Sequence, residues 1–171
     1  MSTTLQKIRE SVLRWLKEES ALGEKAAVDD PNALLDFEIT YEDLKLNVIQ
    51  ASRNSDNFFI VAKWILSRPQ LDLHKSKMDD AKRVEFFWEL QSVLLANNEL
   101  GNCEMKPDPP NDFRELIISS CPIYYDALTK DVLMRRILIV RKSMMRSVFL
   151  LEKYAGVLPS NQPSKTHVRY Q

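Results

Sequence analysis

The chain has 171 residues, of which 44% are hydrophobic and 28% charged, a composition typical of a soluble globular domain and not of a disordered chain. Basic and acidic residues balance at 24 each, so the overall basic excess of many nucleic-acid-binding domains is absent. No apolar run is long enough for a membrane span, and the N-terminus lacks the apolar stretch of a signal peptide. We therefore expect a cytoplasmic protein whose two cysteines are reduced.

The first third of the chain predicts an amphipathic helix followed by an antiparallel meander. Within residues 4–20 the apolar side chains recur at helical spacing, at Leu5, Ile8, Val12, Trp15 and Leu16. After a loop at 24–33, apolar and polar residues alternate in two runs, which predicts two strands joined by a turn at Glu42-Asp43. Segment 58–66 is almost entirely apolar, which predicts a third strand in the centre of the sheet.

Helical periodicity returns in residues 76–100, where Ser76 and Asp79 have the spacing of a capping box. One face of this helix carries most of the apolar residues, namely Val84, Phe87, Trp88, Leu94 and Leu95. Phe86, Leu90 and Val93 widen the apolar surface beyond one stripe. A surface this wide predicts contact with the sheet on one side, and with the last helix or a second subunit on the other. We therefore take Phe86, Leu90 and Val93 as candidate partner-binding residues.

The last third predicts two further strands and a long helix. Segment 103–112 begins as an edge strand and becomes a proline-rich loop, and 113–121 is a strand that an edge segment continues after Pro122. A helix follows over 130–155, and residues 157–171 are expected to form a flexible tail. The order is α-β-β-β-α-β-β-α, which predicts a single α+β domain over 1–156, with an antiparallel sheet and helices packed on it.

The usual catalytic and cofactor-binding motifs are missing. Three isolated glycines exclude a phosphate-binding loop, and the two cysteines lack the spacing of a metal site. His74 is predicted in an exposed loop and His167 in the tail, and neither has a motif partner. We therefore predict no catalytic residues, no metal and no cofactor.

The run Tyr124-Tyr125-Asp126 has a structural and a functional interpretation. In a strand the two tyrosines point to opposite faces, so one packs inward, while Asp126 or Thr129 caps the last helix. Alternatively, Tyr124 and Tyr125 bind a partner at the rim of the sheet. An enzyme using the two tyrosines and Asp126 is the least favoured alternative.

The charge is unevenly distributed along the chain. Residues 131–171 hold eight basic residues and two acids, a net charge of +6 that the rest of the chain balances. The favoured interpretation is an internal match between the last helix and an acidic body. The alternative is a basic face for a phosphate or a nucleic acid, formed by Arg135, Arg141, Lys142 and Arg146.

Three segments, "RWLKEE" (14–19), "EFFWELQSVLL" (85–95) and "IYYDALTKDVLMR" (123–135), carry a resemblance to a known family. The chain resembles a small, mainly archaeal family that is catalogued as a domain of unknown function. That family is similar in fold to the bacterial type III secretion chaperones, which implies the same order of elements. The resemblance further implies a homodimer that binds an extended segment of a client.

These observations favour a non-enzymatic protein-interaction module. Its partner would be a second copy of the chain or an extended segment of another protein. The alternative function is nucleic-acid or phosphate binding through the basic face of the last helix.

Overall fold

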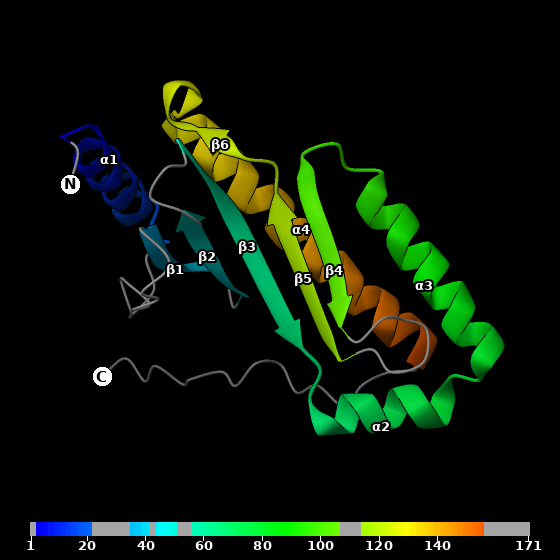
Figure 1. The fold of residues 1–171 in the computed structure, drawn as a ribbon. Coiled ribbons are helices and arrows are strands. Elements are labelled where there is room, and N and C mark those ends of the chain that lie inside the picture. Colours follow the sequence, from blue (N-terminus) through cyan, green and yellow to red (C-terminus); the bar gives the residue numbers. More distant parts are fainter. Residues whose placement is uncertain (1–2, 22–34, 42–43, 51–55, 107–113, 156–171) are drawn as a thin grey trace, which may run out of the picture.

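A computed structural model describes residues 3–21, 35–41, 44–50, 56–106 and 114–155, and shows helices packed on an antiparallel sheet (Figure 1). In chain order the elements are α1 (Thr3–Glu18), β1 (Leu35–Tyr41), β2 (Leu44–Gln50), β3 (Asn57–Ile65), α2 (Arg68–Lys77), α3 (Asp80–Leu95), β4 (Leu100–Lys106), β5 (Glu115–Ser120), β6 (Ile123–Tyr124), the 3-10 turn η1 (Tyr125–Ala127) and α4 (Lys130–Ala155). The predicted α+β class is confirmed, with the helix α2 added to the expected order. The predicted loop at 24–33 and tail at 157–171 lie outside the described residues.

The sheet has the strand order β1-β2-β3-β5-β4, and β6 pairs with the start of β3. All pairs are antiparallel, and Ala62 of β3 lies between Leu46 of β2 and Ile118 of β5. The apolar strand β3 is central, as its sequence predicts, with β2 on one side and β5 on the other. The predicted edge strand is also confirmed, since β4 ends the sheet.

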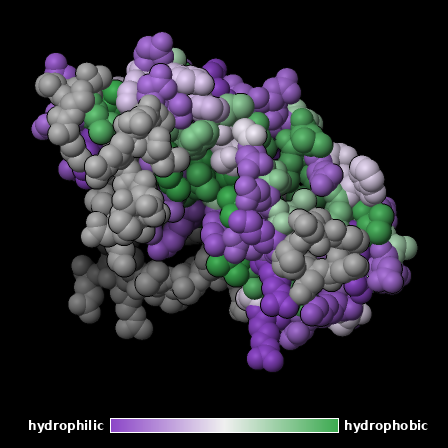
Figure 2. Space-filling model, in the orientation of Figure 1, coloured by the Kyte–Doolittle hydropathy of each residue, from purple (hydrophilic) through white to green (hydrophobic). Residues whose placement is uncertain are grey.

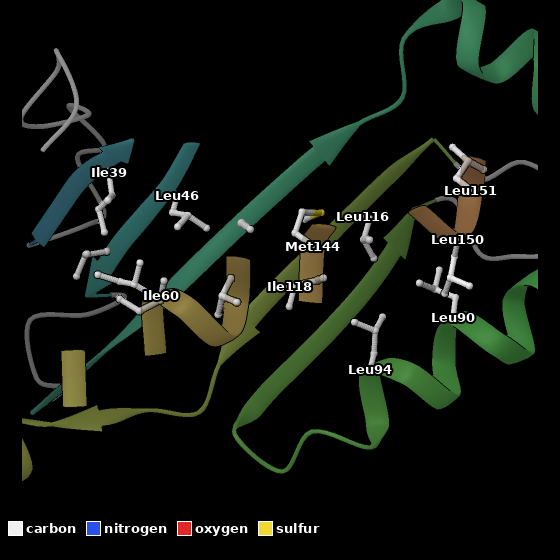
Figure 3. Packing of buried hydrophobic residues seen from close by; sticks show 14 of the residues in the cluster. Ile39, Leu46, Ile60, Leu90, Leu94, Leu116, Ile118, Met144, Leu150 and Leu151 are labelled. Atoms are coloured by element: carbon white, nitrogen blue, oxygen red, sulfur yellow. The ribbon is translucent and has the colours of Figure 1, made fainter. Parts of the chain in front are cut away.

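One face of the sheet carries the core, and α4 lies across it (Figure 1). Alternate residues of the strands are at most 1% exposed on this face, among them Leu46, Val48, Phe58, Ile60, Leu116 and Ile118. The inward side of α4 contributes Leu133, Ile137, Val140, Met144 and Leu151, of which Figure 3 labels Met144 and Leu151. The inward side chains of the strands, at every second position, and those of α4, at every third or fourth, therefore form one apolar layer.

The opposite face of the sheet is more polar. Ile49, Phe59, Val61 and Ile117 are partly exposed there, with charged residues around them. Figure 2 shows this face, where apolar and charged side chains are mixed.

The helix α1 lies at the β1 side of the sheet (Figure 1). Its predicted stripe is confirmed, since Val12 and Leu16 are fully buried. The backbone oxygen of Ala21 accepts a hydrogen bond from the Thr40 amide at 3.0 Å, which ties the end of the helix to β1. Lys130, the first residue of α4, pairs with Glu18 at 2.9 Å and connects the two helices.

The short helix α2 corrects the prediction of a loop after β3. Pro69 lies in its first turn, where a missing amide hydrogen costs little, and the Ser67 amide donates to Gln70 Oε1 at 2.8 Å. The predicted exposed loop position of His74 is wrong, because this helix buries it to 2% exposure, its ring 6.2 Å from that of Phe86. Asp79 caps α3 by accepting from the Lys82 amide at 2.8 Å.

Candidate protein-binding surfaces

The helix α3 packs with a different side inward from the one the sequence suggests. Phe86, Phe87, Leu90 and Leu94 are buried against α4 and the sheet, and Figure 3 shows Leu90 facing Leu150 of α4. Phe86 and Leu90 are both 0% exposed. The structure therefore corrects their prediction as partner-binding residues, because neither can reach a partner while α3 keeps its place in the core.

The outward side of α3 carries three large apolar residues, Val84, Trp88 and Leu95, which are 43%, 68% and 77% exposed. Their spacings of four and seven residues place them on one face of the helix, with Gln91 between them. We call these three residues the α3 stripe. Trp88 and Leu95 are the residues that the helix would bury first if a partner were available.

A hollow of about 400 Å³ separates α3 from the edge of the sheet. Gln91, Leu94 and Leu95 line it from α3, and Cys103 and Met105 line it from β4. Because β4 ends the sheet, its outer backbone groups pair with no other strand of the described chain. This edge can accept an additional strand, and the hollow can accept side chains of that strand.

A second groove, of about 550 Å³, runs between α3 and α4. Its lining residues are Glu89, Ser92 and Val93 of α3, the capping residue Ala96 directly after it, and Arg146, Phe149, Leu150 and Lys153 of α4. We call it the α3/α4 groove. Val93, a predicted partner-binding residue, is half-buried in this groove, and Phe149 is 58% exposed at its wall.

Some residues of the predicted basic face of α4 form ion pairs with an acid of the same chain, and others are exposed. Arg135 lies 3.5 Å and Arg136 3.4 Å from the Glu99 carboxylate, which follows α3 in the chain. Arg141 is partly buried, whereas Lys142 and Arg146 are exposed. The pairs with Glu99 support the interpretation of an internal charge match, and they leave Lys142 and Arg146 as the open part of this face.

The segment Tyr124-Tyr125-Asp126 joins β6 to η1. The Tyr125 ring packs inward, 6.4 Å from that of Phe58, and burial raises the pKa of its hydroxyl. Tyr124 points outward and is 48% exposed, so the prediction of one inward and one outward tyrosine is confirmed. Thr129 caps α4 by accepting from the Val132 amide at 3.2 Å, while Asp126 is exposed.

Within the described ranges, no group of three or more histidine, cysteine or acidic side chains is arranged to hold a metal ion. None of the helices in this part of the chain is both long and apolar enough to cross a membrane. The two cysteines carry free thiols.

These features define an α+β protein in which α4 covers one face of an antiparallel sheet and α3 flanks its edge. Residues 8–151 match the family described as "Uncharacterized conserved protein (DUF2299)", and the chain belongs to this family. The predicted membership of an uncharacterised family is thus confirmed. No curated protein sequence matches the chain.

The matches to this chain among solved structures include the following two. An uncharacterized protein from Methanothermobacter thermautotrophicus is 24% identical over 87% of this chain and 99% of its own, with a TM-score of 0.73. This likeness shows a shared fold, in an archaeal protein. YbjN from E. coli is 7% identical over 84% of this chain and 88% of its own, with a TM-score of 0.44.

Proposed function

We propose that the protein is a non-enzymatic protein-interaction module that forms a homodimer through the α3 stripe. The observation that carries this proposal is the outward apolar face of α3, where Trp88 is 68% and Leu95 77% exposed. Together with Val84 they expose on the order of 400 Å², the size of the largest apolar patch on a typical monomer, which is often functional. Burial of this patch against another chain would remove it from water.

The stripe suits a second copy because it is nearly symmetric along the helix. In an antiparallel pair of α3 helices related by a two-fold axis, Val84 of each copy would lie near Leu95 of the other. Trp88 and Gln91 would then flank the axis, and the large indole would cover the centre of the contact. The α3 stripe of each copy would in this way be buried against the α3 stripe of the other.

The open edge of β4 supports the binding of an extended client segment. Strand addition supplies backbone hydrogen bonds, and the adjacent hollow beside Leu94, Cys103 and Met105 would accept alternate side chains. Leu95 belongs to the α3 stripe and also lines the hollow, so a client and a second copy would lie side by side. The outward Tyr124 is a further candidate contact for a client.

No catalytic group enters this proposal, and no cofactor or metal is needed for it. The two free thiols suit a reducing compartment, and we propose that the protein acts in the cytoplasm.

Light scattering tests the proposal through the mass of the chain in solution. The wild type is expected at twice the chain mass of 19.9 kDa, and Trp88→Lys is expected at the chain mass. The matched control is Ile65→Lys, which changes an apolar residue 62% exposed on β3 and should leave the dimer intact. A monomeric wild type, or dimer loss in both variants, would contradict the assignment of the stripe.

A further inference from the structure

The walls of the α3/α4 groove have the spacing of a helix-binding groove. Each wall uses positions i, i+3, i+4 and i+7 of its helix, starting at Glu89 on α3 and at Arg146 on α4. Seven residues at 1.5 Å each give a length of about 10 Å, or two helical turns. The groove is therefore long enough for two or three apolar side chains from one face of another helix.

The floor of the groove is apolar and its backbone offers little pairing. Leu150 is 9% exposed and Val93 half-buried, while Phe149 forms an exposed apolar wall. The amides along these parts of α3 and α4 bond within the helices, and so do the carbonyls outside the last turn of α3. An extended segment would find few backbone partners here, whereas a helix satisfies its own backbone groups and needs only side-chain contacts.

The two ends of the groove differ in charge. At one end Lys153 pairs with Glu89 at 2.8 Å, so its charge is compensated. At the other end Arg146 is exposed, and Lys142 lies one turn before it on α4. Within the described part of the chain no carboxylate forms an ion pair with either residue. This end is therefore complementary to acidic side chains.

We propose that the α3/α4 groove binds an amphipathic helix of a partner protein, with its apolar stripe on Val93, Phe149 and Leu150 and acidic residues beside Lys142 and Arg146. This inference rests on the proposed function, since it names one class of partner. It uses a different side of α3 from the stripe, so the two can fail independently.

A pair of designed peptides tests the inference by fluorescence anisotropy. Both are labelled 18-residue helices with a leucine stripe on an alanine background. The charged residues beside the stripe are glutamates in one peptide and lysines in the other. The glutamate peptide is expected to bind about tenfold more tightly, because two exposed ion pairs replace two like-charge contacts. Trp88→Lys should bind the glutamate peptide like the wild type, even when dimerisation fails.

A charge reversal separates recognition from general adhesion to an apolar surface. Arg146→Glu combined with Lys142→Glu is expected to reverse the preference toward the lysine peptide, whereas Lys17→Glu on α1 should leave it unchanged. Phe149→Lys should abolish binding of the glutamate peptide. Equal affinity for both peptides, absence of binding, or an unreversed preference would overturn the inference. The mass of Phe149→Lys in solution should equal that of the wild type when no peptide is present. A lower mass for this variant, together with a wild type that binds no peptide, would place a second copy in the groove and also overturn the inference.

Discussion

The Glu89 carboxylate of α3 accepts from Lys153 Nζ at 2.8 Å and from the Tyr154 hydroxyl at 2.6 Å, both on α4. The Lys153 ammonium also lies 5.0 Å from the centre of the Tyr154 ring. Three side chains thus join the middle of α3 to the end of α4. This cluster closes one end of the α3/α4 groove and holds the two helices in register.

The Glu89 cluster predicts a pH-dependent contribution to stability. The hydrogen bonds from Lys153 and then Tyr154 lower the pKa of Glu89 below its ordinary 4.5. A lowered pKa stabilises the fold above the ordinary value, and this stabilisation is lost as the pH falls through the folded value. Glu89→Gln should therefore lower the free energy of unfolding at neutral pH, and this loss should become smaller in acid, as the pH falls below the ordinary value of 4.5.

Urea denaturation at the two pH values measures this effect. Asp72→Asn, at an exposed acid of α2, is the control, and its difference from the wild type should be small at both values. A Glu89→Gln effect of equal size at neutral and acid pH would show that the carboxylate charge is not what stabilises the helix pair.

The burial of α3 predicts unequal costs for two phenylalanine truncations. Phe86 is 0% exposed, so Phe86→Ala should lower the free energy of unfolding by about 3–5 kcal/mol. Phe149 is 58% exposed, so Phe149→Ala should change it by about 0.5 kcal/mol or less. Chemical denaturation compares them, and similar costs for both would mean that α3 packs differently.

The sequence predicts α3 but not which side of it faces the core. Phe86 and Leu90 are spaced as regularly as Val84, Trp88 and Leu95, so apolar residues cover almost the whole helix. Periodicity distinguishes an apolar from a polar face and cannot rank two apolar faces. The choice depends on the position of α4 and β4 beside the helix, which a single sequence does not show.

Proline at the start of α2 explains the helix that sequence reasoning missed. Pro69 comes after the end of β3 and lies in the first turn of α2, a position where proline is favoured. The apolar run of β3, by contrast, predicts its central place in the sheet correctly, although only one face of the strand is fully buried. The sequence does not predict which basic residues of α4 are paired. Glu99 pairs with Arg135 and Arg136 because the fold brings it beside α4, and no regular spacing in the sequence indicates this contact.

Gly101 is predicted to be intolerant of a side chain. A Cβ atom there would lie 2.5 Å from the Ser120 carbonyl oxygen, at a bulge between β4 and β5. Because the obstructing atom is backbone, Gly101→Ala should lower the free energy of unfolding by about 2 kcal/mol. Asn102→Ala, at the next and exposed position, should cost less in the same denaturation experiment. An unchanged stability in Gly101→Ala would contradict the close approach of these strands.

Cys103 is predicted to react slowly with thiol reagents in the folded protein. Burial, with a smaller effect of Glu104, raises the pKa of its thiol to about 11. At mildly alkaline pH this leaves on the order of a hundredfold fewer thiolates than an unperturbed cysteine has. Thiol labelling of Cys121→Ser should therefore be slow when native and fast in urea. Fast native labelling would show that β4 opens to solvent.

Chemical cross-linking tests directly whether the α3 helices of two chains lie against each other. Gln91→Cys, in a Cys103→Ser and Cys121→Ser background, places a single thiol in the centre of the α3 stripe. A short bis-maleimide should join two chains at this position and not at Ser92→Cys, on the groove side of the same helix. Covalent dimers from Gln91→Cys at low micromolar concentration are the predicted result, and equal or absent cross-linking at the two positions would contradict it.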